Sequence, residues 1–120
     1  MTMVQNDAPQ VDTKNGIDYK VADVGALPHR NGAFAAVAAQ LVLNFVSSPR
    51  QALQEMIRVT QPGGVVAASV WDFRGGLIFQ RMFWDTAAGI DPGAGRTRDR
   101  LFSGALALPD GLLALFEQSG

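Results

Sequence analysis

The amino-acid sequence predicts an α/β fold with about three parallel strands and flanking helices. Two observations support this prediction. The segment 34–46 is almost continuously apolar, which is typical of a strand covered by helices on both faces of a parallel sheet. A capped helix beginning near Ser48 separates this segment from a strand-like run at 65–71. Strands separated by helices pair in parallel.

The first third of the chain is predicted to contain a mobile leader and the first strand. Residues 1–16 are polar without an apolar period, so we expect the domain to span 17–120. Residues 17–22 alternate apolar and polar side chains over the length of a short strand. Gly and Pro residues then mark a turn that ends at Gly32.

The middle of the chain is predicted to form a strand over 35–40, a turn or short helix through 41–45, and then a longer helix. Ser48 suits the N-cap of that helix, Pro49 its first position, and Gln51 the capping-box position. Helical spacing divides the following side chains into two sets. The inward set is Leu53, Met56 and Ile57, and the outward set is Arg50, Gln54, Glu55 and Arg58.

The remainder is predicted to form a strand, a helix, a loop and a helix. The Pro-Gly-Gly sequence at 62–64 ends the preceding helix and leads into a Val-rich strand at 65–71. Residues 77–88 are apolar on most sides of a helix, so this helix must be covered. The segment 90–100 is rich in Gly, Pro and Arg and indicates a loop, and 109–118 indicates a final helix.

Composition excludes several function classes. The 120 residues carry a formal net charge of -1, which gives no electrostatic footprint for nucleic acid or an anionic membrane. There is no cysteine, and the single histidine, His29, cannot form a His-rich metal site. Apolar runs are too short to cross a bilayer, and the amino terminus has no secretory-signal pattern. We therefore expect a cytoplasmic chain without a metal, a nucleic-acid partner or a membrane partner.

Short segments between Tyr19 and Phe73 carry a resemblance to a known family. They are ADVGALP at 22–28, FAAV at 34–37, QLVLNF at 40–45, EMIRV at 55–59, QPGG at 61–64 and ASVWD at 68–72. In this order and spacing they resemble class I S-adenosylmethionine-dependent methyltransferases of the ubiquinone/menaquinone-biosynthesis type. The resemblance implies a partial Rossmann-like, doubly wound methyltransferase core.

The resemblance also implies a cofactor site and a substrate side. With S-adenosylmethionine as cofactor, the residue matching Asp23 accepts from the adenine amino group and the backbone beside Val24 contacts the ring, which their hydrogen-bonding chemistry allows. Gln40 and Leu41 match pocket positions at the carboxyl end of a strand, where open α/β sheets bind ligands. The residues implied on the substrate side are Asn44, Trp71 and Asp72.

This sequence departs from the family pattern in one important respect. In the family, the glycine-rich loop and the ribose-binding acidic residue belong to elements that should lie before Ile17, where this sequence has only a short polar leader. Gly25, Gly32 and the Gly pairs at 63–64 and 75–76 lack the strand–loop–helix context of that loop. In the family, two further strands separate the first two strands predicted here. We therefore expect a truncated chain whose first strand repacks, or a homo-oligomer that exchanges strands.

Three of these polar residues keep an alternative interpretation. Asp23 either contacts adenine or caps a turn after a strand. Asn44 either meets the substrate or the methionine carboxylate, or hydrogen-bonds backbone at a strand end. His29 either acts as a general base or, as is more common for a histidine in a turn, is solvated.

Two larger groups of side chains are equally open to two interpretations. One group forms either an aromatic wall for a flat substrate or part of the core; it consists of Trp71, Phe79, Phe83 and Trp84. The other either binds an anion or lies in a solvated loop balanced by Asp91 and Asp99; it consists of Arg96, Arg98 and Arg100.

The predicted function is methyl transfer from S-adenosylmethionine to a small-molecule acceptor. In-line displacement at the sulfonium methyl needs orientation more than covalent help from the protein, so no catalytic residue is assigned. Without the glycine-rich loop, turnover by this chain alone is not expected. The alternative is a non-catalytic oligomeric or binding protein built on a remnant of the methyltransferase fold.

Overall fold

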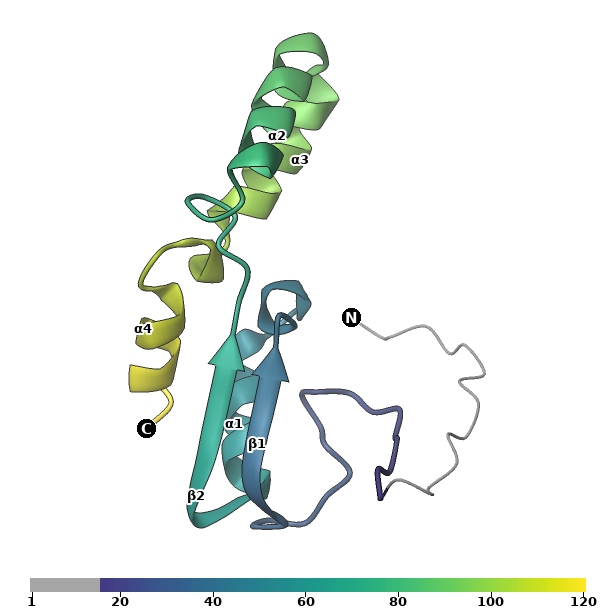
Figure 1. Cartoon of the computed structure of the whole chain (residues 1–120), viewed down its shortest axis with the longest axis vertical. Coiled ribbons are helices and arrows are strands. Elements are labelled where there is room, and N and C mark those ends of the chain that lie inside the picture. The colour runs from purple at the N-terminus through teal and green to yellow at the C-terminus, as the bar shows by residue number, and fades with distance from the viewer. Residues whose placement is uncertain (1–15) are drawn as a thin grey trace.

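The computed structural model describes residues 16–120 (Figure 1). The predicted leader, residues 1–16, lies outside the described residues except for Gly16. The described strands are β1 (Phe34–Gln40) and β2 (Thr60–Ser69). The helices are α1 (Pro49–Val59), α2 (Ile78–Ile90), α3 (Pro92–Ser103) and α4 (Gly111–Glu117), and two short 3-10 helices, η2 (Leu43–Phe45) and η3 (Ala105–Ala107), precede α1 and α4.

The two strands form a parallel pair, which confirms the predicted α/β class. Val37 pairs with Val66 and Gln40 with Ser69, so both strands end at the same edge. The prediction of a further strand at 17–22 is wrong, because this segment forms no ladder with β1 or β2. An alternating pattern becomes a strand only where a neighbouring edge accepts its N–H and C=O groups. Within the described residues that pairing is limited to β1 and β2.

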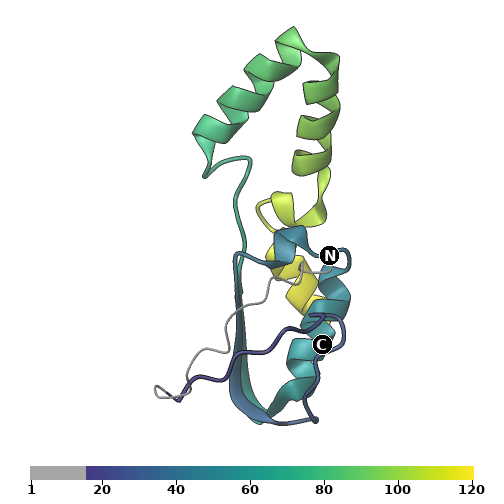
Figure 2. The same ribbon diagram turned by 90° about the vertical axis from the view of Figure 1, so that its right-hand side faces the viewer.

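Helix α1 begins as the sequence predicts and covers one face of the sheet. The Ser48 hydroxyl accepts a hydrogen bond from the Gln51 N–H at 3.4 Å, and Pro49 occupies the first turn. The inner side of the helix is buried at Ala52, Leu53, Met56 and Val59. Figure 2 shows α1 and α4 on the same side of the sheet, where Leu112 and Leu115 of α4 pack against the cluster of Leu43, Ala52 and Leu106.

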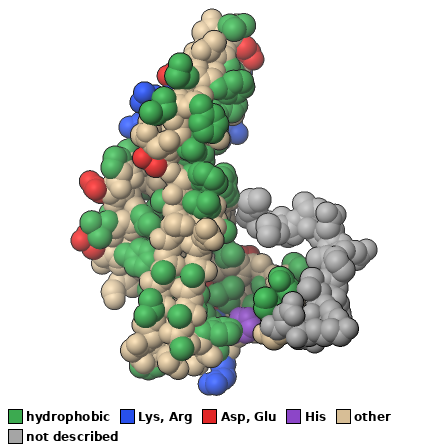
Figure 3. Space-filling view, viewed as in Figure 1, with side chains coloured by type: hydrophobic (Ala, Val, Ile, Leu, Met, Phe, Trp, Pro, Cys, Tyr) green, Lys and Arg blue, Asp and Glu red, His purple; other side chains and the backbone are tan. Residues whose placement is uncertain are grey.

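The opposite face of the sheet is exposed to solvent. Its side chains are small and apolar; Ala36, Ala38, Val65 and Ala67 are all exposed. Figure 3 shows small hydrophobic side chains spread over this face. The continuous apolar run of β1 is therefore covered on one side only within the described residues.

The predicted loop at 90–100 is wrong, because this segment forms most of α3 and pairs with α2 in a helical hairpin (Figure 1). Asp91 caps α3 by accepting from the Gly93 N–H at 2.8 Å, and Pro92 has no N–H to leave unsatisfied in the first turn. Gly95 lies against Ala88 of α2, at a distance where an added Cβ would make an ordinary contact of 3.6 Å. Residues typical of loops thus serve here as helix start and helix contact.

The Pro-Gly-Gly sequence lies inside β2 and not between α1 and the strand. β2 begins at Thr60, immediately after α1, and its pairing with β1 is irregular between Phe34 and Ala36. Gly63 adopts a positive φ of 77°. At Gly64 an added Cβ would lie 2.6 Å from the Ala35 carbonyl oxygen. Gly63 is therefore needed for its backbone conformation, and Gly64 is needed because the β1 backbone leaves no room for a side chain.

We predict that Gly64→Ala destabilises the fold more than Gly63→Ala. The first change forces a methyl group against the β1 backbone, an overpacking cost of about 1–3 kcal/mol. The second places a side chain at positive φ with nothing within 4 Å, which costs about 1 kcal/mol. Urea unfolding of both variants measures the difference, and equal losses would contradict the close approach at Gly64.

Candidate functional site

The carboxyl ends of the parallel strands form the edge around which the candidate site lies. Gln40 and Ser69 are paired at this edge, and the Leu41 N–H extends the ladder by donating to the Ser69 carbonyl oxygen at 2.9 Å. Ligands of open α/β sheets bind outside the carboxyl ends of the strands. The structure therefore places Gln40 and Leu41 at this edge, and their role in cofactor binding stays a prediction.

Leu41 has a backbone conformation that the sequence does not reveal. Its φ of 58° makes it the non-glycine residue with positive φ within the described chain. The left-handed conformation costs an L-residue on the order of 1 kcal/mol, and such strain concentrates at functional sites. Here it turns the chain from β1 into η2 directly at the carboxyl edge.

Asn44 connects the segments that follow the two strands. Its side-chain oxygen accepts from the Trp71 N–H at 2.7 Å, and its Nδ2 donates to the Trp71 carbonyl oxygen at 3.3 Å. The amide thus pairs with the backbone of Trp71 as a neighbouring strand would. Of the two interpretations of Asn44, the structure shows the backbone contact. Its predicted place on the substrate side remains a prediction.

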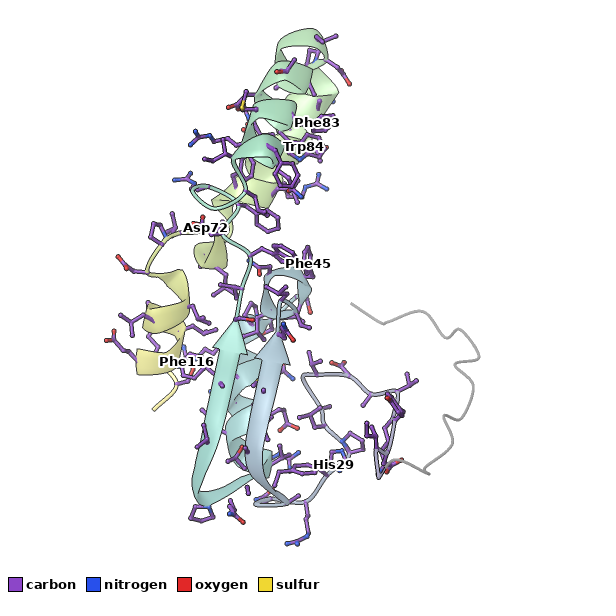
Figure 4. All side chains as sticks on the ribbon, viewed as in Figure 1. His29, Phe45, Asp72, Phe83, Trp84 and Phe116 are labelled. Atoms are coloured by element: carbon purple, nitrogen blue, oxygen red, sulfur yellow. The ribbon has the colours of Figure 1, made fainter. Side chains whose placement is uncertain are left out.

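Asp72 organises the loop between β2 and α2. Its carboxylate accepts from the N–H groups of Arg74 at 3.1 Å and Gly75 at 2.7 Å, and its carbonyl oxygen accepts from the Leu77 N–H at 3.0 Å. In Figure 4, Asp72 lies where the strands give way to the helical hairpin. Asp72 therefore holds the loop that leads into α2.

Asp23 and Val24 line a small pocket at the start of α1. The Asp23 carboxylate accepts from the Gly25 N–H at 2.8 Å, so it caps a turn as the alternative interpretation holds. The Gln51 side chain donates to the Gly25 carbonyl oxygen at 2.9 Å and joins this turn to α1. The pocket has a volume of about 70 Å³ and is completed by Val46, Ser47 and Ser48. Gln40 and Leu41 do not line it.

A half-buried ion pair on α1 holds the segment that follows this turn. The Arg58 guanidinium binds both carboxylate oxygens of Glu55, at 2.6 and 2.7 Å. Its remaining N–H groups donate to the carbonyl oxygens of Leu27 and His29 and to the side chain of Asn31. The Leu27 N–H donates back to Glu55 at 2.7 Å. We refer to these contacts as the Glu55–Arg58 latch.

The latch corrects the prediction that Glu55 and Arg58 point into solvent. Their side chains are only 18% and 31% exposed. The hydrogen bonds from Arg58, followed by that from the Leu27 N–H, lower the pKa of Glu55 from its ordinary 4.5 to about 2. The carboxylate in turn raises the pKa of Arg58. Helical spacing assigned both residues to the polar face of α1. That spacing could not indicate that the loop at 27–31 packs over this face.

An aromatic hollow lies between the sheet edge and the helical hairpin. It has a volume of about 510 Å³ and is lined by Phe45, Phe73, Phe79, Gln80, Phe83, Trp84 and Leu101. Phe45 and Phe73, which follow β1 and β2, meet edge to face with centroids 6.2 Å apart. Figure 4 shows Phe45 at the sheet end and Phe83 and Trp84 on α2. We refer to this as the aromatic hollow.

The aromatic hollow contains three of the four residues predicted as an aromatic wall. Phe79 and Phe83 are 67% and 62% exposed, so the alternative that they belong to the core is wrong. Trp71 does not line the hollow. Phe45 and Phe73 were missed, and their positions directly after the two strands were the available signal.

The remaining candidates have structural partners. The ring of His29 packs edge to face on Phe34 at 4.9 Å. Arg98 pairs with Asp99 at 2.8 Å and with Asp85 at 3.2 Å. Because α3 is a helix, Arg98 lies on a different side from Arg96 and Arg100. The predicted balancing of this group by acidic residues is therefore seen for Arg98.

Two general features of the described chain bear on the site. Within residues 16–120, His, Asp and Glu side chains form no cluster of three that could hold a metal ion. In the same range, no helix combines the length and apolarity that crossing a membrane requires.

Comparison with known proteins identifies the family. Residues 1–68 match the model of the methyltransferase domain family, so the chain belongs to that family. It is a class I methyltransferase-type chain with likeness to the ubiquinone/menaquinone group, as the sequence predicts. No solved structure gives a significant match.

Curated relatives match about two fifths of the chain. A demethylmenaquinone methyltransferase of Renibacterium salmoninarum is 46% identical over 48 residues, covering 40% of this chain and 20% of the relative. The same enzyme of Paenarthrobacter aurescens is 44% identical over 48 residues, covering 40% and 19%. A malonyl-[acyl-carrier protein] O-methyltransferase of Salmonella typhimurium is 41% identical over 49 residues, covering 41% and 20%. The match thus spans about a fifth of the length of these relatives.

We predict that the latch makes stability depend on acid pH. Because folding lowers the pKa of Glu55 from 4.5 to about 2, its contribution is present above pH 4.5 and is lost as the pH falls toward 2. Glu55→Gln should reduce stability at neutral pH and flatten this part of the profile. Urea unfolding across this range measures it, with Glu117→Gln on α4 as control. An unchanged profile in Glu55→Gln would contradict the latch.

We predict that Asn44→Ala loosens the junction between the two strand ends. Removal of two hydrogen bonds should cost about 1–2 kcal/mol in the free energy of unfolding. The specific readout is hydrogen exchange at the Trp71 amide, which should speed up while the amides within β2 keep their protection. Unaltered exchange at Trp71 would show that Asn44 does not hold this segment.

Proposed function

We propose that this chain takes part in transferring a methyl group from S-adenosylmethionine to a small-molecule acceptor. The observation that carries the proposal is that, in a member of the methyltransferase domain family, an aromatic hollow opens at the carboxyl edge of the parallel strands. The cofactor would lie along that edge, and the acceptor would occupy the aromatic hollow. We also propose a cytoplasmic location, which suits a chain without cysteine.

The residues at the Asp23 pocket have the chemistry needed to bind the edge of adenine. A carboxylate accepts several hydrogen bonds, so Asp23 can serve the Gly25 N–H and an exocyclic amine together. The neighbouring backbone at Val24 supplies a donor for a ring nitrogen. At about 70 Å³ the pocket holds a ring edge and not a whole nucleoside. The ribose and methionine parts therefore need contacts beyond this pocket, along Gln40 and Leu41.

The aromatic hollow has the chemistry to orient a flat, apolar acceptor. Phe and Trp faces provide large contact area and favour stacked or edge-to-face arrangements. Gln80 adds a polar group at the wall. Bound S-adenosylmethionine supplies an electrophilic methyl group on a sulfonium. The protein's part is to align the acceptor with that methyl and to exclude water, and good alignment alone lowers a barrier by several kcal/mol.

The bare sheet suggests a homo-oligomer as the partner arrangement. Within the described residues, β1 and β2 each have one unpaired edge, and one face of the pair is exposed. Unpaired edges are templates for strands of another chain. We propose a homo-oligomer, in which exchange of strands at these edges is one route of association.

Cofactor binding is the test of the proposed function. Calorimetric titration of the 120-residue chain with S-adenosylhomocysteine should give micromolar affinity. Asp23→Ala removes a charge-assisted hydrogen bond and should weaken binding by tenfold to a hundredfold. Asp18→Ala is the matched control, because Asp18 lies outside the pocket and pairs with Lys20.

The opposite result would favour a binding protein without catalysis. No binding at millimolar ligand would sink the enzyme proposal for this chain. Equal weakening in Asp23→Ala and Asp18→Ala would remove Asp23 from the cofactor site while leaving binding itself in place.

A further inference from the structure

Helix α2 presents two different faces. One face packs on α3, where Asp85 pairs with Arg98 and Ala88 lies against Gly95. The other face carries a stripe of large apolar side chains with no cover among the described residues. Its members are Phe79, Met82, Phe83 and Ile90, which are 67%, 64%, 62% and 82% exposed. Hydrophobic side chains are visible on the surface of the hairpin in Figure 3.

The stripe is continuous along the helix. Its positions follow the spacing i, i+3, i+4 and i+11, with Thr86 at i+7, which places them on one side of an α-helix. Single exposed apolar residues are ordinary on protein surfaces, but a contiguous stripe of this kind marks an interaction site. We refer to it as the α2 stripe.

The order of side-chain sizes identifies the partner that fits the stripe. Along α2, the large residues Met82 and Phe83 come first, and the small residues Thr86 and Ala87 follow one turn later. When two such helices run antiparallel, Met82 of each copy faces Ala87 of the other, and Phe83 faces Thr86. Phe79 then meets Ile90 at both ends. A parallel pair would instead set each large side chain against its own copy. Alternation of large and small residues is what lets facing helices interdigitate.

We infer that the α2 stripe is the interface of a two-fold symmetric dimer in which α2 of a second copy crosses it antiparallel. The charged side chains of α2 lie off the stripe: Asp85 is on the face packed against α3, where it pairs with Arg98. The stripe itself contains no charged residue, so no charge is desolvated without a partner.

The area of the stripe sets the expected strength. Phe79 and Phe83 expose about two-thirds of side chains that each bury roughly 150–250 Å², and with Met82 and Ile90 the stripe offers on the order of 500 Å² per copy. A standard interface buries about 800 Å² per partner. We therefore expect a reversible dimer of micromolar affinity.

Dimer formation would also complete the aromatic hollow. Phe79 and Phe83 belong both to the stripe and to the wall of the hollow. A second α2 laid along the stripe covers the open side of that wall. This consequence rests on the proposed acceptor site, whereas the dimer itself does not.

Light scattering and sedimentation equilibrium of the full chain, from low micromolar to several hundred micromolar, test the dimer. The wild type should dimerise with increasing concentration, and Met82→Glu should weaken the dimer at least tenfold. Leu113→Glu on α4 is the matched control, because Leu113 is 61% exposed on another helix and should leave the dimer unchanged. Far-UV circular dichroism establishes that each variant is folded.

Cross-linking provides a second, independent measurement. The chain has no cysteine, so Thr86→Cys introduces the single thiol of the molecule. Under mild oxidation it should give a covalent dimer, whereas Thr97→Cys on α3 should not. A wild type that stays monomeric throughout, or a dimer that survives Met82→Glu, would overturn the inference. A dimer abolished by Val65→Thr but not by Met82→Glu would assign the interface to the bare sheet instead. Cofactor titration of Met82→Glu separates loss of the dimer from failure of the proposed function.

Discussion

The bidentate pair between Glu55 and Arg58 is the interaction on which the shape of the candidate site depends. All five N–H groups of the Arg58 guanidinium are used. Three donate to Leu27, His29 and Asn31, and two bind the Glu55 carboxylate, which accepts from the Leu27 N–H. Residues 16–33 contain no helix and no strand, so their path depends on hydrogen bonds to α1, from its side chains and from the Arg58 carbonyl oxygen to the Gly32 N–H. The latch thus adds to the Gln51 hydrogen bond that joins the turn carrying Asp23 to α1.

Apolar runs and helix-capping residues in the sequence predicted the elements whose formation depends mainly on nearby residues. The strand at 35–40 and the capped helix at Ser48 follow from apolar runs and end signals, and both were confirmed. Residues 17–22 have the alternation of a strand, but pairing needs a neighbouring edge, which no local pattern reveals. The segment after Asp91 was predicted to be a loop because of its Gly and Pro residues, but Gly95 lies within helix α3 and against Ala88 of α2.

The candidate site was predictable in its position and not in its contacts. The carboxyl edge follows from parallel pairing, and the aromatic residues of α2 were recognised as a group. Phe45 and Phe73 were missed because their joining to that group depends on the angle at which the hairpin leaves the sheet. The uses of Asn44 and Asp72 also depend on backbone groups that only the folded chain brings near. Tertiary geometry, in each case, decides which of several ordinary roles a polar side chain takes.

The aromatic hollow is built from two separate bodies. Phe45 and Phe73 belong to the sheet unit, whereas Phe79, Phe83, Trp84 and Leu101 belong to the α2–α3 hairpin. The hairpin joins the rest of the described chain through the Asp72 loop on one side and the segment at Gly104 on the other. Its helices pack mainly on each other and on η3. The width of the hollow therefore depends on the angle between the hairpin and the sheet unit. A ligand that contacts both parts would favour closure of the hairpin onto the sheet.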